Sequence, residues 1–137
     1  MSDYKILRAD EAPDYTGGQV PSPFLGYGRP LGSEQLAVNV RVLAPGATNV
    51  PPGGDPTGGH HHKTIEEIYL VIDGEIEIKL NDDVHRLGKR DAVLIAPGTT
   101  RATRNPTDAE AAFAMISVKV EDPLAETVMV EGFWPSG

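Results

Sequence analysis

The chain of 137 residues contains no cysteine, which excludes disulfide frameworks and metal sites built on thiolates. Aromatic residues make up only 6% of the chain, and no apolar run approaches the roughly 18 residues that a membrane span requires. Basic residues are also scarce, because 12 lysines and arginines stand against 20 aspartates and glutamates, for a net charge of −8. Phosphate backbones and anionic membranes are recognised by clustered basic residues, so the sequence predicts neither a nucleic-acid partner nor a membrane partner.

Glycine and proline are abundant by contrast, with 15 and 12 residues. A chain this rich in turn-forming residues is poor in long helices, and its length is that of one domain. Residues 1–34 predict an irregular amino-terminal arm that packs on the barrel or on a partner subunit, and residues 35–137 predict a single β-barrel domain. Residues 1–10 are too polar for a secretory signal, so we expect a cytoplasmic protein.

Alternation of apolar and polar residues predicts several short strands. From Leu36 to Val42 the apolar side chains fall on one face, which predicts a half-buried strand. Asp73-Gly74 is a strong hairpin dipeptide, and residues 81–83 predict another turn. Short strands with turn residues between them indicate a sandwich or barrel. Further strands are expected at residues 67–72, 75–80, 84–87, 91–96, 111–120 and 127–130, the last of them at a sheet edge.

The expected strand at 67–72 is apolar on both of its faces. Tyr69 and Val71 lie on one face, and Ile68, Leu70 and Ile72 lie on the other. A barrel interior accommodates one of these faces only, so the amino-terminal arm or a second subunit must cover the other. We therefore expect a homodimer.

Three of the four histidines are consecutive, at positions 60–62. On a strand, His60 and His62 point to the same side with Cα atoms about 6.6 Å apart, while His61 points away. Imidazole nitrogens at that separation can converge on one metal ion, although solvated loop histidines remain the alternative. Glu67 follows His62 at an odd interval, so its convergence with the histidines requires a turn or bulge within residues 63–66. The neighbouring Glu66 is expected to be a solvated carboxylate.

Residues 60–74 read His-x-His-x4-Glu-x6-Gly, with His60, His62, Glu67 and Gly74 in place. This pattern resembles the first motif of the cupin superfamily. Residues 90–105 resemble the second cupin motif only in part, because Gly98 and Asn105 match but Arg101 stands where the family has a histidine. The resemblance covers roughly residues 36–120 and implies an all-β fold, a small antiparallel jelly-roll β-barrel that is often a homodimer.

The resemblance also implies a metal site, with His60, His62 and Glu67 as ligands. The family's fourth ligand does not carry over, because an arginine at position 101 remains protonated and has no lone pair to offer. Two histidines and one carboxylate suit non-haem Fe(II), and also Mn, Co, Ni or Zn, so the identity of the divalent metal stays open.

Two functions follow from these residues. In the first, the chain is a metal-dependent enzyme of the dioxygenase, isomerase, lyase or cyclase type, as the resemblance implies, and it acts on a small anionic substrate. Arg101 then holds the anionic group and Tyr69 contributes a phenol to substrate binding. In the second, the Arg101 cation has replaced the metal and pairs with Glu67, and the chain is a non-catalytic module that binds a small organic acid through Arg101. A surface position for Arg101 and a purely structural dimer are the remaining alternatives.

Overall fold

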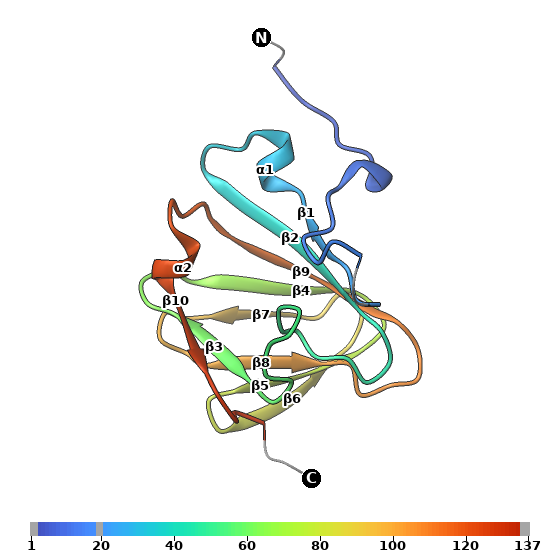
Figure 1. The fold of residues 1–137 in the computed structure, drawn as a ribbon, viewed down its shortest axis with the longest axis vertical. Coiled ribbons are helices and arrows are strands. Elements are labelled where there is room, and N and C mark those ends of the chain that lie inside the picture. The colour runs from blue at the N-terminus through green and yellow to red at the C-terminus, as the bar shows by residue number, and fades with distance from the viewer. Residues whose placement is uncertain (1–2, 19–20, 135–137) are drawn as a thin grey trace.

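The computed structural model of the protein describes residues 3–18 and 21–134 (Figure 1). Residues 1–2 and 19–20 of the predicted arm, and residues 135–137 of the predicted barrel domain, lie outside the described residues. Within the described ranges, no helix is long and apolar enough to cross a membrane.

Two five-stranded antiparallel sheets form the body of the protein (Figure 1). Sheet A has the strand order β1-β2-β9-β4-β7, and sheet B has the order β10-β3-β8-β5-β6. The predicted all-β antiparallel barrel is therefore confirmed. Sheet A consists of β1 (Phe24–Gly26), β2 (Leu36–Leu43), β4 (Glu67–Asp73), β7 (Ala92–Ile95) and β9 (Ala111–Val118). Sheet B consists of β3 (Gly59–His62), β5 (Ile76–Leu80), β6 (Asp83–Leu87), β8 (Arg101–Arg104) and β10 (Thr127–Val130).

The arm that the sequence predicts to be irregular contains three short elements: a 3-10 helix η1 (Ala9–Glu11), strand β1 and helix α1 (Gly28–Leu31). Strand β1 pairs with β2, with Leu25 opposite Val40, and thereby adds an edge strand to sheet A. The carboxyl-terminal part of the chain adds helix α2 (Pro123–Glu126) and the edge strand β10. Both ends of the chain thus extend the edges of the two sheets.

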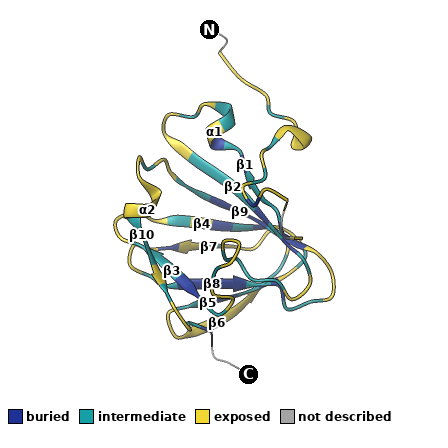
Figure 2. Ribbon diagram, in the orientation of Figure 1, coloured by how far each residue is buried: buried dark blue, intermediate teal, exposed yellow. Residues whose placement is uncertain are grey.

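The hydrophobic core lies between the inner faces of the sheets, where Figure 2 shows buried residues on β4, β8 and β9. On β4 the predicted alternation holds, because Tyr69 and Val71 are fully buried whereas Ile68 and Ile72 are 40% and 44% exposed. The buried core residues are Leu43, Tyr69, Val71, Ile76, Ile78, Ile95, Ala111, Phe113 and Met115.

The apolar face of β2, which carries Leu36, Val38, Val40 and Val42, points away from the core. Leu36 is exposed, whereas Arg41 and Leu43 are buried on the opposite face. The half-buried strand that the alternation predicts is therefore present, with its apolar face on the outside of the barrel. The reason is that the outer face of sheet A is itself apolar, so the valines of β2 continue that face, and the polar residues of β2 point toward the interior of the barrel.

The Asp73-Gly74 turn does not close a hairpin, because β4 belongs to sheet A and β5 to sheet B. Gly74 has a φ of +67°, and a Cβ at this position would lie 2.7 Å from the carbonyl oxygen of Glu110. Glycine is therefore required where the chain passes between the sheets. The hairpin occurs one turn later, where Leu80 pairs with Asp83 and Asn81 adopts a φ of +52°.

Candidate metal centre and ligand cavity

Strand β3 carries His60 and His62 on its inner face. Each of these histidines has a polar partner on one of the two strands that flank β3. On β8, Arg101 lies directly opposite His60, and on β10, Thr127 lies directly opposite His62. Residues that pair across two strands point to the same side of the sheet, so all of these side chains face the interior. The Thr127 hydroxyl oxygen lies 3.2 Å from His62 Nδ1, which is within hydrogen-bonding distance.

The segment between β3 and β4 makes the turn that the odd interval between His62 and Glu67 requires. Here the chain leaves sheet B and enters sheet A. The Glu126 carboxylate of helix α2 accepts hydrogen bonds from the backbone N–H and the hydroxyl of Thr64 and from the N–H of Ile65. The backbone carbonyl of Glu126 also accepts from Lys63 N–H at 3.0 Å. A residue distant in the sequence therefore holds the turn that directs Glu67 inward.

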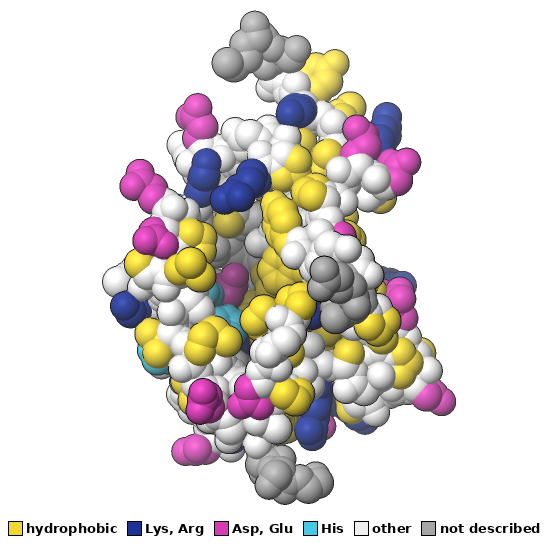
Figure 3. Space-filling model, viewed as in Figure 1, with side chains coloured by type: hydrophobic (Ala, Val, Ile, Leu, Met, Phe, Trp, Pro, Cys, Tyr) yellow, Lys and Arg dark blue, Asp and Glu magenta, His cyan; other side chains and the backbone are white. Residues whose placement is uncertain are grey.

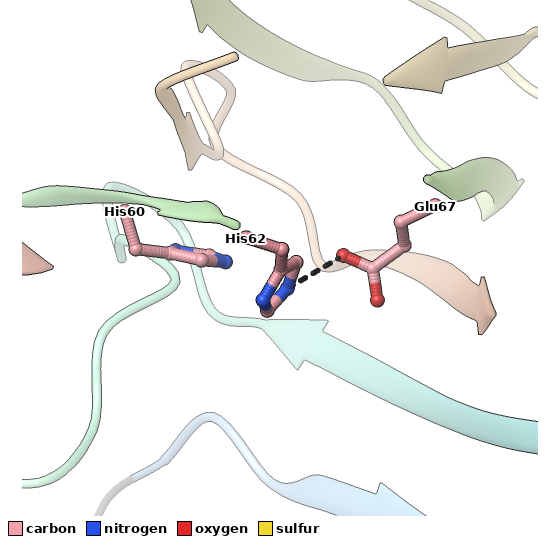
Figure 4. Close-up of side chains that lie close together, drawn as sticks. All are labelled: His60, His62 and Glu67. Atoms are coloured by element: carbon pink, nitrogen blue, oxygen red, sulfur yellow. Dashed lines mark ion pairs between the residues drawn. The ribbon is translucent and has the colours of Figure 1, made fainter. Parts of the chain in front are cut away.

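The turn brings His60, His62 and Glu67 together, as Figure 4 shows. One potential ligand atom from each of the three side chains lies within 4.8 Å of the other two. His62 Nε2 is 3.4 Å from Glu67 Oε1, and the two imidazole rings have centroids 5.2 Å apart. The neighbouring Glu66 is exposed and does not belong to this group.

The protonation states of the group suit metal binding. Burial lowers the pKa of His60 to about 4, and the charge of Arg101 acts in the same direction, so the imidazole is neutral at pH 7 and keeps a lone pair for a metal. Burial acts to raise the pKa of Glu67, but hydrogen bonds from His62 and Arg101 outweigh it and hold this pKa below its usual value. The carboxylate is therefore ionised. Two imidazoles and a carboxylate fit a divalent metal ion in charge and in donor type.

Arg101 lies behind Glu67, away from the cavity. The residue is only 1% exposed and does not line the cavity described below. Its Nη2 donates to Glu67 Oε1 at 2.7 Å, its Nη1 donates to the carbonyl oxygen of Thr99 at 3.1 Å, and its Nε lies 3.5 Å from the hydroxyl of Tyr69. The guanidinium nitrogens are thus engaged in contacts within the protein, and the contact with Glu67 orients that carboxylate.

A cavity of about 440 Å³ opens between the two sheets and ends at this group. Figure 3 shows the hollow, with histidine and acidic side chains at its bottom and hydrophobic side chains around it. Tyr69 lines the cavity, as do His60, His62 and Glu67. Strand β2 adds Arg41, which the alternation of this strand puts on the face opposite its apolar side chains. The period-2 pattern of β2 does mark Arg41 as one of a polar row, but it does not tell which face is inside.

Comparisons with known proteins agree with this architecture. The family model described as "Cupin domain" matches residues 46–118. The β-D-galactosidase Rv1717 of Mycobacterium tuberculosis is 33% identical over 125 residues, which cover 89% of this chain and 97% of that protein. A solved sugar phosphate isomerase of the cupin superfamily from Silicibacter pomeroyi superposes with a TM-score of 0.73 at 18% identity, covering 93% of this chain and 92% of that one. A cupin protein from Bacteroides fragilis gives a TM-score of 0.67 at 23% identity, with 89% of both chains covered. The chain therefore belongs to the cupin family.

Proposed function

We propose that this cupin binds a small molecule in the cavity between its sheets and acts on it with a divalent metal held by His60, His62 and Glu67. The observation that carries the proposal is the convergence of the three ligand atoms within 4.8 Å at the wall of the cavity. The cavity volume of about 440 Å³ lies in the range of small-molecule sites, about 300–1,000 Å³.

The side chains around the group support this function. A bound divalent metal supplies Lewis-acid chemistry, which polarises a carbonyl or carboxylate or activates water or dioxygen. With a metal bound, the Nδ1–H of His62 would be donated to the Thr127 hydroxyl, which orients the ring and leaves Nε2, the nitrogen that otherwise faces Glu67 Oε1, free as a ligand. Burial raises the pKa of Tyr69 above its usual value, so the phenol stays protonated and can donate a hydrogen bond to a molecule in the cavity.

The name of the Mycobacterium tuberculosis relative suggests a carbohydrate as substrate, but the carboxylates of this cavity do not suit two-carboxylate glycoside hydrolysis. That mechanism needs one carboxylic acid that is protonated before it donates to the leaving group. Of the described residues that line the cavity, Glu67 and Glu126 carry carboxylates, and hydrogen bonds hold the pKa of both below the usual value. Metal-centred chemistry on a small molecule is therefore the better proposal.

One observation favours a second candidate function, a metal-free binding module. The ion pair between Arg101 and Glu67 places a positive charge next to the carboxylate that would bind the metal. However, both close contacts of Glu67 use the same oxygen, Oε1. A carboxylate has two oxygens with about four lone-pair sites, so Glu67 can hold Arg101 and a metal together.

Elemental analysis of untagged protein, followed by calorimetric titration with Fe(II), Mn(II), Co(II), Ni(II) and Zn(II), separates the two functions. The metalloenzyme proposal expects one equivalent of metal in the wild type and none in His60→Ala. A wild type that is isolated without metal and binds none of the added ions would establish the binding module instead.

We further propose that two copies of the chain associate through the outer face of sheet A. Here Val38, Ile116, Ile68 and Leu94 form one apolar row across four strands, and Val40, Ala114, Leu70 and Ala92 form the next. Strand β1 lies at the far edge of sheet A, so the arm leaves Ile68 and Ile72 exposed. Neither row carries a charge, and a second copy offers the same uncharged apolar face, so two chains of net charge −8 can approach there without close repulsion.

Sedimentation velocity at micromolar concentration tests the dimer. The wild type should sediment as a species of twice the 14.6 kDa chain mass, and Ile68→Glu should sediment as the monomer. Val84→Glu is the matched control, because Val84 is an exposed apolar residue on β6 of sheet B and its replacement should leave the dimer intact. A monomeric wild type would refute this assembly.

A further inference from the structure

Arg41 is a buried cation without an anionic partner among the described residues. Its side chain extends from β2 into the cavity, and the residue is 3% exposed. Nη2 donates to the carbonyl oxygen of Val50 at 3.0 Å, whereas Nε has no hydrogen-bond partner. No carboxylate of the described residues lies within 4.0 Å of the Arg41 nitrogens.

The surroundings of Arg41 do not neutralise it. The guanidinium carbon lies 5.5 Å from the centroid of the Phe24 ring, at an edge of the cavity. Asp14 is the acidic residue whose field acts on Arg41, but Asp14 Oδ1 already accepts hydrogen bonds from the N–H and hydroxyl of Thr16 and from the N–H of Phe24. Burial outweighs this field and lowers the pKa of Arg41, although an arginine still remains protonated.

The other arginines on strands, which lie on β6 and β8, differ from Arg41 in this respect. Arg101 is paired with Glu67, Arg104 with Glu77 and Arg86 with Glu75. An unpaired buried charge with an orphaned N–H costs free energy, and such a cost is typical of a position that serves binding. The planar fork of an arginine matches carboxylate and phosphate oxygens, which accept two parallel hydrogen bonds from it.

We propose that Arg41 anchors an oxyanion group, a carboxylate or a phosphate, of the small molecule that occupies the cavity. This inference rests on the proposed function, because the molecule that Arg41 anchors is the same one that contacts the group of His60, His62 and Glu67 at the wall of the cavity. Asn39, two residues along the inner face of β2, and Ser117 of β9, which pairs with Ala37, line the same cavity and supply neutral hydrogen-bonding groups further along it. The ligand class is therefore a small acid or phosphate ester with polar groups beyond its anionic end. Arg101 donates to Glu67 and does not line the cavity, so we do not assign it as the anchor of the anionic group.

Calorimetric titration of metal-stripped protein with inorganic phosphate and with malonate tests the anchor, with glycerol as an uncharged control ligand. We expect the wild type to bind at least one of the two anions and not glycerol. Arg41→Met should bind that anion roughly ten- to a hundredfold more weakly, because charge-assisted hydrogen bonds are lost. Arg41→Lys should lie between the two, since it keeps the charge and loses the fork. Arg86→Gln removes an exposed arginine from β6 and should bind as the wild type does. The anion that binds more tightly distinguishes a carboxylate ligand from a phosphate ligand.

Three further measurements separate this inference from a structural role and from the metal site. The metal-free melting temperature of Arg41→Met should equal or exceed that of the wild type, because the variant removes an unpaired buried charge. Anion binding should persist in metal-stripped His60→Ala, and metal titration of Arg41→Met should match the wild type, so that failure of the metal proposal leaves this test intact. Equal anion binding by Arg41→Met and wild type, no anion binding by the wild type, or a marked loss of stability in Arg41→Met would overturn the inference.

Discussion

Replacement of Arg101 by histidine should make the metal-free protein less stable and its metal binding tighter. Arg101 donates to Glu67 at 2.7 Å and is almost fully buried, so its removal leaves the Glu67 carboxylate without its cationic partner. The same change removes a fixed positive charge beside the metal group and supplies an imidazole on the strand that pairs with His60. The two effects have opposite signs and are measured separately.

The size of each effect follows from the geometry. Loss of one partner of a buried ion pair costs about 3 kcal/mol, which for a domain of this size lowers the melting temperature by about 10 °C. A metal on the other oxygen of Glu67, Oε2, would lie at most about 7 Å from Arg101 Nη2, given the 2.7 Å contact at Oε1 and a metal–oxygen bond of about 2.1 Å. Charges of +2 and +1 at about 7 Å repel by about 1 kcal/mol at the dielectric constant of water and by about 5 kcal/mol at an effective dielectric constant of 20. The larger value exceeds the 1.4 kcal/mol or so that corresponds to a tenfold change in affinity.

Differential scanning calorimetry without metal and titration calorimetry with Zn(II) at fixed pH measure these effects. Arg104→His is the matched control, because Arg104 lies on the same strand, faces the other side of the sheet and bonds to Glu77 at 2.8 Å. This control should leave the metal affinity unchanged. Equal metal affinity in wild type and Arg101→His would refute the reasoning, because it would mean that the charge at position 101 does not act on the metal group.

Variants at four further positions test the arrangement around the metal group. His61→Ala should keep the metal content of the wild type, whereas His62→Ala should lose the metal in elemental analysis, because His62 lines the cavity and His61 does not; metal loss in His61→Ala would contradict this. Thr127→Val should weaken metal binding in calorimetry by about tenfold or more, because the His62 ring loses the group that orients it, and Thr127→Ser should restore it. Glu126→Gln should lower both the melting temperature and the metal affinity, because the turn at Thr64 loses its charged acceptor; unchanged metal affinity would show that the turn holds without it.

Local periodicity is the part of this protein that the sequence determines by itself. Residues two apart on a strand share a face, so the pairing of His60 with His62 and the exclusion of His61 follow from the chain alone. The odd interval to Glu67 likewise requires a turn, and the structure places that turn where the chain passes from sheet B to sheet A. These features depend on neighbouring residues only, which is why they are readable without a structure.

Tertiary structure decides which face of a strand is inside and which distant residues meet there. The alternation in β2 is the same whether Val40 or Arg41 points inward, and the packing of the two sheets selects Arg41. The packing likewise turns Asp73-Gly74 into a passage between sheets, and it brings Glu126 to the turn at Thr64. Each of these contacts joins segments whose separation in the sequence carries no periodic signal, so only the assembled barrel reveals them. The pairing of Arg101 with Glu67 is one of two alternatives that the partial second motif leaves open, and it forms in the barrel, where β8 pairs with β3.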